Sequence, residues 1–155
     1  MGFKRLGVLF GEVGALSVRE TQVMEGIFRL RRQTNRWARF AEVSVRLVPA
    51  ASAGVVVRAD VLRWSHPSAA VGSAEAEARE GAWYALRGLP AGVRSLLVEV
   101  TEIAIAPADT GPGDVKFAAA HAVWQALGYL PPRPPFTGED GNPVFPVAET
   151  PEQGL

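Results

Sequence analysis

Residues 38–48 alternate between apolar and polar side chains with the two-residue period of a β-strand. The apolar positions are Ala41, Val43, Val45 and Leu47, and the polar positions between them are Glu42, Ser44 and Arg46. One face of this strand requires a core and the other tolerates water. The pattern therefore restricts the fold to a sheet covered by packed elements on one face.

Two further segments read as strands on either side of this one. Residues 20–33 precede it, and the link 34–37 is short enough for a hairpin. Residues 55–63 follow a turn-rich stretch and alternate again, with Val55 and Val57 on the apolar face. Three consecutive strands predict an antiparallel meander.

The next segments predict a helix and a fourth strand. Ser73 is a candidate N-cap, and Glu75 and Glu77 suit the positive end of a helix that runs to about Arg87. Residues 95–105 are β-branched and apolar, which favours a central strand.

A second helix is predicted over residues 115–127, capped by Asp114 and ended by Gly128. Seven of the 27 residues from Tyr129 onward are proline, so that segment is expected to be an extended arm or a disordered end. The order β-β-β-α-β-α predicts an α+β two-layer sandwich with both helices on one sheet face.

Composition excludes several classes of function. The 155 residues suffice for one core, and 16 Lys and Arg balance 16 Asp and Glu, so the chain as a whole has no field for nucleic acid or membrane. There is no cysteine and there are only two histidines, so we expect no disulfide, no metal site and no cofactor. Without a long apolar run or a clear targeting segment, the chain is expected to be cytoplasmic and not membrane-bound.

Several strings resemble domain IV of translation elongation factor G and of the related tetracycline ribosomal-protection proteins. Val18-Arg19-Glu20-Thr21 resembles the segment that opens that domain, and Gly26-Ile27-Phe28-Arg29 with Arg32-Gln33 resembles its first long strand. Glu80-Gly81 lies where the family has Glu or Met before Gly, and residues 101–126 resemble the last strand, the tip loop and the final helix. The similarity covers residues 18–128.

The resemblance implies a fold like that of ribosomal protein S5 domain 2. It divides the chain into a lead-in segment (1–17), the domain (18–128) and the proline-rich arm (129–155). No Gly-x-x-x-x-Gly-Lys-Ser/Thr motif is present, so we expect neither GTP binding nor a translocation motor. The loop 34–37 is shorter than in the factor, and the tip loop 105–113 has no histidine.

The first candidate site is a basic edge. Residues 18–47 contain seven arginines against three acids, and an arginine fork beside a tryptophan suits phosphate and base. The candidate RNA or anion contacts are Arg29, Arg31, Arg32, Arg36, Trp37 and Arg39. The alternative is that the arginines are a solvated strand face that the acidic C-terminal segment neutralises.

The second candidate site is the outer face of the two helices. On a helical wheel, an alanine stripe faces the sheet in each helix, which leaves large aromatic side chains on the other side. Trp83 then lies between Arg79 and Arg87, at cation–π spacing. The candidate protein-interface residues are Arg79, Trp83, Arg87, Phe117, His121 and Trp124. The alternative is that the arm folds back over this face.

These patterns favour a non-catalytic interaction module that self-associates or binds another protein. Ribosome or RNA binding in translation is the alternative. No catalytic constellation is found: no Gly-x-Ser-x-Gly elbow accompanies Ser65-His66, and Asp114 and His121 are two helical turns apart.

Overall fold

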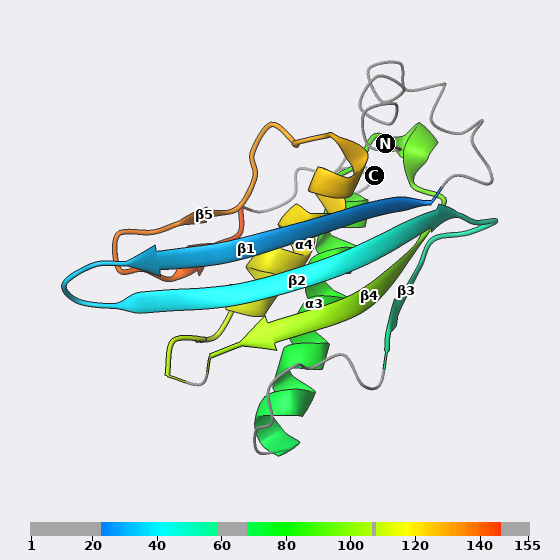
Figure 1. The fold of residues 1–155 in the computed structure, drawn as a ribbon. Helices are drawn as coiled ribbons and strands as arrows, with labels where there is room; N and C mark the ends of the chain where they lie inside the picture. Colours follow the sequence, from blue (N-terminus) through cyan, green and yellow to red (C-terminus); the bar gives the residue numbers. More distant parts are fainter. Residues whose placement is uncertain (1–22, 59–67, 107, 147–155) are drawn as a thin grey trace.

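The computed structural model describes residues 23–58, 68–106 and 108–146, and Figure 1 shows its four-stranded sheet in front of two helices. β1 (Met24–Gln33) and β2 (Ala38–Pro49) pair as an antiparallel hairpin. In the turn between these strands, Thr34 Oγ1 accepts hydrogen bonds from the backbone N–H groups of Arg36 at 3.1 Å and Trp37 at 3.2 Å. The short link therefore suffices because one hydroxyl satisfies two turn donors.

The predicted meander is wrong in its third strand. The sheet order is β1-β2-β4-β3, so β3 (Gly54–Val57) lies beside β4 (Leu96–Ile105) and not beside β2. β3 pairs with β4 in parallel, which requires a long crossover. Helix α3 supplies that crossover, and β4 takes the central position expected of it. The predicted residues 59–63 of this strand lie outside the described residues.

Both helices cover the same face of the sheet, as the apolar alternation requires (Figure 1). The alternating apolar side chains Ala41, Val43, Val45 and Leu47 of β2 are at most 2% exposed, and apolar residues of β4 meet them across the pair. The α+β two-layer architecture and the element order are confirmed. None of the helices in the described ranges is long and apolar enough to cross a bilayer.

α3 (Ser68–Arg87) begins five residues before the predicted Ser73 cap. Its end is as predicted, because the N–H of Gly88 bonds back to the carbonyls of Tyr84 and Ala85 at 3.2 and 3.1 Å. The predicted inward stripe is buried at 0–5% exposure: Ala74, Ala78, Ala82, Ala85 and Leu89. A short 3₁₀ turn, η1 (Ala91–Val93), then leads to β4.

α4 (Asp114–Leu127) ends at Gly128, whose φ is +69°, but its N-terminus differs from the prediction. Asp114 is the first helical residue, and its carboxylate accepts the N–H of Gly111 at 2.7 Å instead of capping the helix. Glu77 of α3 accepts the N–H groups of Gly113, Val115 and Lys116 at 2.9–3.2 Å. The predicted role of Glu77 at the start of its own helix is therefore corrected: it caps the neighbouring helix.

Two glycines let α4 approach its neighbours closely. A Cβ built on Gly26 of β1 would lie 2.4 Å from the carbonyl oxygen of Ala122, and one on Gly81 of α3 would lie 2.3 Å from that of Lys116. Real Cβ atoms do not come so near a backbone oxygen. The positions of both glycines are explained by packing against α4.

The described part of the C-terminal arm, residues 129–146, is extended. β5 (Phe136–Thr137) and β6 (Pro143–Val144) form a hairpin with two residues in each strand, and its loop includes Gly141 at φ +86°. β5 lies beyond the free edge of β1 (Figure 1). Residues 129–146 have the extended form among the two that the sequence predicts, and residues 147–155 lie outside the described residues.

Candidate binding groove

The large side chains of the outer helical face are covered by the chain itself. Trp124 is 1% exposed and donates its indole N–H to the carbonyl of Ala85 at 3.1 Å. Phe117 is 5% exposed and lies edge-on to Phe145 of the arm, with ring centres 6.4 Å apart. Trp124 is therefore a core residue and not an outward interface residue. Phe117 is covered in part by the arm, as in the alternative in which the arm folds back over this face.

Further contacts hold the arm on α3 and α4. Tyr84 donates its hydroxyl to the carbonyl of Pro146 at 2.9 Å, and its ring meets that of Phe145 at 5.4 Å. Lys116 places its ammonium 4.3 Å above the Phe145 ring. Burial also raises the pKa of Tyr84, so its hydroxyl stays a hydrogen-bond donor.

A chain ending after Arg133 is expected to bind an apolar dye more strongly and to associate at high concentration. It loses the Phe145 ring, which leaves Phe117 and Tyr84 facing water. A chain ending after Pro146 is the control, because it keeps every arm contact described above. Equal dye fluorescence for the two truncations would contradict the covering role.

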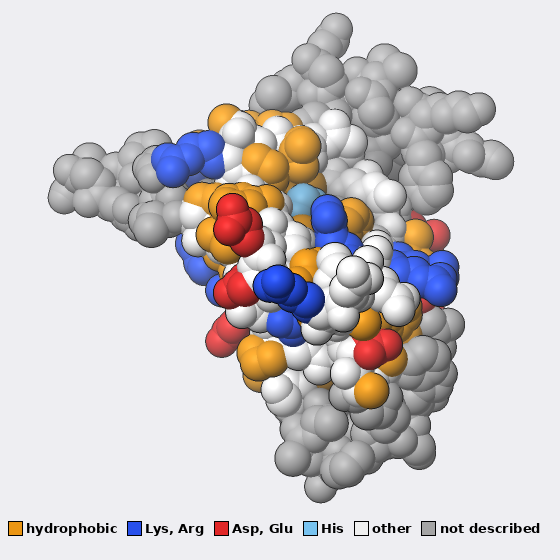
Figure 2. Space-filling view, turned by 90° about the vertical axis from the view of Figure 1, so that its left-hand side faces the viewer, with side chains coloured by type: hydrophobic (Ala, Val, Ile, Leu, Met, Phe, Trp, Pro, Cys, Tyr) orange, Lys and Arg blue, Asp and Glu red, His pale blue; other side chains and the backbone are white. Residues whose placement is uncertain are grey.

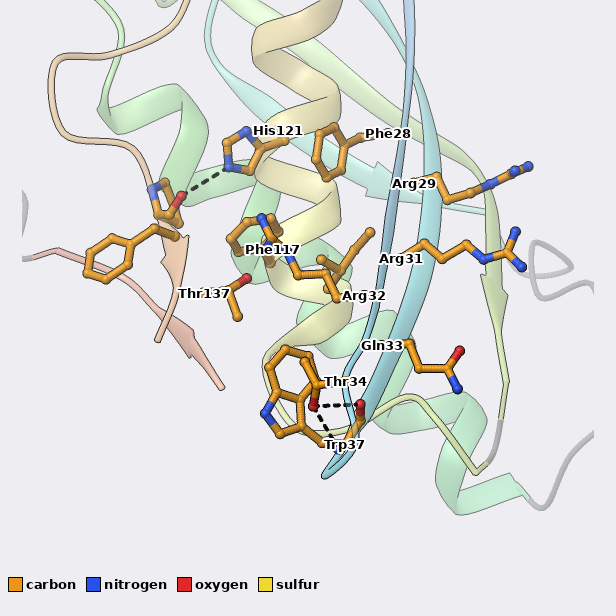
Figure 3. A pocket seen from close by; sticks show the side chains of 13 residues that line it. Phe28, Arg29, Arg31, Arg32, Gln33, Thr34, Trp37, Phe117, His121 and Thr137 are labelled. Atoms are coloured by element: carbon orange, nitrogen blue, oxygen red, sulfur yellow. Dashed lines mark hydrogen bonds between the residues drawn. The ribbon is translucent and has the colours of Figure 1, made fainter. Parts of the chain in front are cut away.

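Between the arm and the edge of the sheet lies a groove of about 610 Å³. One wall is the consecutive run 28–34 of β1, and the other is residues 135–137 of the arm. Trp37, Phe117 and His121 complete the lining. Figure 3 shows these side chains, and we call this feature the edge groove.

The floor of the edge groove is a cluster of three rings, Phe28, Phe117 and His121. The His121 ring stacks on Phe28 at 4.8 Å and is tilted against Phe117 at 4.6 Å, and the centres of the two phenylalanine rings are 6.0 Å apart. The Nε2 of His121 is 3.3 Å from the carbonyl of Pro135, to which the Nε2–H tautomer donates. Burial lowers the pKa of His121, so the neutral ring is the form present at neutral pH and the floor carries no charge.

The β1 wall presents unpaired backbone groups to the edge groove. The N–H of Thr34 bonds to the carbonyl of Trp37, which places the even-numbered residues of β1 in the hydrogen-bonded pairs with β2. The N–H of Ile27 points the other way and donates to Gln125 Oε1 at 2.9 Å. Beyond it, the outward groups of Arg29, Arg31 and Gln33 bond to nothing in the described part of the chain.

The six predicted RNA or anion contacts separate into two groups. Arg31, Arg32 and Arg36 are exposed and make no ion pair with a described residue, and Arg29 is 3.1 Å from Glu42. Figure 2, which looks onto the side of the molecule at the left of Figure 1, shows basic side chains across this face with apolar ones among them.

The second group is committed to internal contacts. Arg39 has a side chain only 14% exposed, lies 3.6 Å from Asp114 and donates to Asn142. A Cβ on Gly141 would meet the Trp37 ring at 2.5 Å, so this loop packs directly on one face of the indole. Arg39 and Trp37 therefore dock the β5–β6 hairpin.

Of the predicted protein-interface residues, Phe117 and His121 line the edge groove, and Trp124 is in the core. Arg79 and Arg87 are exposed on α3, away from the groove, and Trp83 packs partly buried against the core. The cation–π contacts among these elements are made by Lys116, over Tyr84 and Phe145, and none within the described ranges joins Trp83 to either arginine.

Asp114 is a buried acid at the start of α4, next to Arg39. Its side chain is 0% exposed, and its Oδ1 has no hydrogen-bond partner among the described residues. Burial raises its pKa from 3.8 to about 6, and the nearby charge of Glu77 adds to the rise, while the Gly111 N–H and Arg39 oppose it. The folded protein therefore binds a proton at this site more tightly than the unfolded chain does.

The free energy of unfolding is expected to rise as the pH falls from about 7 to 4, relative to an Asp114→Asn variant. One pKa unit corresponds to about 1.4 kcal/mol, so the Asp114 contribution is about 2–3 kcal/mol over this window. Urea unfolding of both proteins across the window measures the difference. If the free energy of unfolding changed with pH in the same way for the wild type and Asp114→Asn, the role given to Asp114 would be contradicted.

Sequence reasoning missed the arm wall of the edge groove and the unpaired backbone of β1. The available signal was the aromatic residue Phe136 within the proline-rich segment. In the structure, Phe136 lines the groove and its side chain is 53% exposed. The described residues contain no cluster of three or more histidine and acidic side chains that could hold a metal ion.

A scan against protein-family models finds no match, and no curated protein matches the chain. Among solved structures, the chain is similar to the crystal structure of ttk003000868 from Thermus thermophilus, with 22% identity and a TM-score of 0.45. The match covers 80% of this chain and 17% of that one, so the chain spans about a sixth of that protein's length. This likeness assigns neither a family nor an activity.

Proposed function

We propose that this protein is a non-catalytic interaction module that binds a protein partner in the edge groove. The observation that carries the proposal is the unpaired backbone of β1 beside an apolar floor. Exposed strand edges are sites of pairing with other chains, and apolar floors with a few polar groups are typical of binding sites. His121 is the one titratable histidine of the groove lining, and its Nε2 is engaged by the carbonyl of Pro135, which favours a binding role for the floor over proton transfer.

The proposal includes descent from the domain IV type of elongation factor G. Its support is the ordered series of matching strings, two of which contain the glycines that α4 requires, Gly26 and Gly81. The departures in loops 34–37 and 105–113 favour a partner other than the decoding centre. Self-association remains part of the proposal, and sedimentation velocity at several concentrations measures it.

RNA binding is the second candidate, favoured by the exposed guanidinium groups of Arg31, Arg32 and Arg36 at one end of the sheet. Phosphate contacts release counterions, so such binding weakens steeply with salt. Two observations count against it: Arg39 is held by Asp114 and Asn142, and one face of the Trp37 ring is against Gly141.

Affinity capture with the immobilised full chain tests the two candidates. Partners are expected to bind the wild type with or without ribonuclease, and to be lost from an Arg31→Glu, Phe136→Ser double variant. Both residues are exposed, so the variant is expected to fold. Arg79→Glu on α3 is the control and keeps the partners.

Two results would contradict the proposal. Capture that ribonuclease abolishes would favour RNA. Partners that still bind the Arg31→Glu, Phe136→Ser variant but no longer bind Arg79→Glu would place the interface on α3.

A further inference from the structure

We infer that the occupant of the edge groove is an extended peptide segment with alternating acidic and apolar residues, which adds to β1 as a fifth strand of the sheet. This inference rests on the proposed function and specifies its partner. It follows from three properties of the groove: its free backbone groups, the directions of its side chains and its charge.

The free backbone groups have the spacing of a strand. The outward N–H and C=O groups of Arg29, Arg31 and Gln33 repeat every second residue, which is the pattern that an added strand pairs with. The run is bounded by Gln125, which occupies the N–H of Ile27, and by the turn that begins at Thr34. The wall 28–34 is roughly 20 Å long at about 3.3 Å per residue, enough for a segment of six or seven residues.

The side chains of β1 divide between the two faces of the sheet. In Figure 3, Arg29, Arg31 and Gln33 point to one side of the strand, and Phe28 and the Phe117–His121 floor lie on the other. An added strand has the same alternation, and residues opposite each other share a face. Its residues beside Arg31 then meet a cation, and the residues between them meet the aromatic rings and the stem of Arg32, which lies on the floor side of β1.

The charge of the wall determines which strands are acceptable. Residues 28–34 carry three arginines and no acid, and two of these, Arg31 and Arg32, make no ion pair with a described residue. A β1 strand from a second copy would place arginines beside arginines, and like charges across a strand pair are destabilising. A strand with glutamate or aspartate at every second position reverses that interaction.

Synthetic peptides provide the test, with the capped heptapeptide Glu-Val-Glu-Leu-Glu-Val-Glu as the probe and the full chain as the receptor. The control, Glu-Glu-Glu-Glu-Val-Leu-Val, has the same composition without alternation. We expect the alternating peptide to bind about tenfold more tightly, because only it can satisfy both faces of an added strand. Arg31→Glu should weaken its binding about fivefold, and Arg79→Glu should leave it unchanged.

Backbone pairing is tested by methylating alternate peptide nitrogens. Every second N–H of an added strand points at β1, so methylation of one set, glutamate or apolar, should abolish binding while methylation of the other set is tolerated. Amide NMR signals of Arg29, Arg31 and Gln33 should shift and exchange more slowly in the complex.

Equal binding of the two heptapeptides, or tolerance of both methylated sets, would overturn strand addition. So would displacement of the probe by an equally charged oligouridine that binds more tightly. If no peptide binds but Arg31→Glu still abolishes partner capture, the groove remains the binding site and the strand inference alone fails. If capture is insensitive to the groove variants, the proposed function itself fails.

Discussion

Replacing Trp124 by alanine is expected to lower the free energy of unfolding by about 3–5 kcal/mol, the usual cost of removing a buried aromatic side chain. Trp124 is 1% exposed and lies among core residues of α3 and α4, so its removal leaves a cavity and deletes the indole hydrogen bond to the carbonyl of Ala85. Urea unfolding followed by circular dichroism measures the loss. The expected loss is a large part of the free energy of unfolding of a typical domain, which is about 5–15 kcal/mol.

Two matched variants make this result specific. Trp124→Phe keeps a ring in the core but loses the indole N–H bond to Ala85, so a smaller loss of about 1–2 kcal/mol is expected. Trp83→Ala removes the same side chain at a partly exposed position and should also cost less than Trp124→Ala. If Trp124→Ala dissociated an oligomer without destabilising the chain, Trp124 would be an interface residue after all.

Gly81→Ala is expected to lower the free energy of unfolding by about 2–3 kcal/mol, although alanine is the better helix former by about 1 kcal/mol. The added methyl would lie 2.3 Å from the carbonyl oxygen of Lys116 and 2.9 Å from the Cβ of Ala119, so α3 and α4 must move apart. Denaturant unfolding measures the change.

Gly92→Ala is the control for this substitution, because no atom lies within 4 Å of the Cβ it would add. Its effect should be within about 0.5 kcal/mol. An increase in the free energy of unfolding for Gly81→Ala, as helix propensity alone predicts, would show that α3 and α4 can accommodate a methyl group between them.

Much of the sheet could be predicted from sequence because its strands have one apolar face. The alternation at Ala41, Val43, Val45 and Leu47 identified the buried face correctly. The position of β3 could not be read from the same signal, since Val55 and Val57 satisfy a core beside β2 or beside β4 equally well. Only the crossover through α3, a long-range feature, decides between them.

The candidate site was predictable only in its side chains. The helical wheel of α4 placed the alanine stripe toward the sheet and Trp124 on the opposite side, but it could not show that α3 packs over Trp124 there. The neutral floor at His121 and the free N–H groups of Arg31 and Gln33 depend on the arm and on strand pairing. The sequence does not show where the arm packs or which backbone groups of a strand stay unpaired, because nearly every residue carries the same N–H and C=O groups.

The capping of α4 by Glu77 makes the two helices one cooperative unit. Its hydrogen bonds join residues 36 to 39 positions apart in the chain, so the first turn of α4 is completed only when α3 is already in place. An isolated α4 segment has no such cap and must fray at that end. Opening of that turn and separation of the helices are thus a single event.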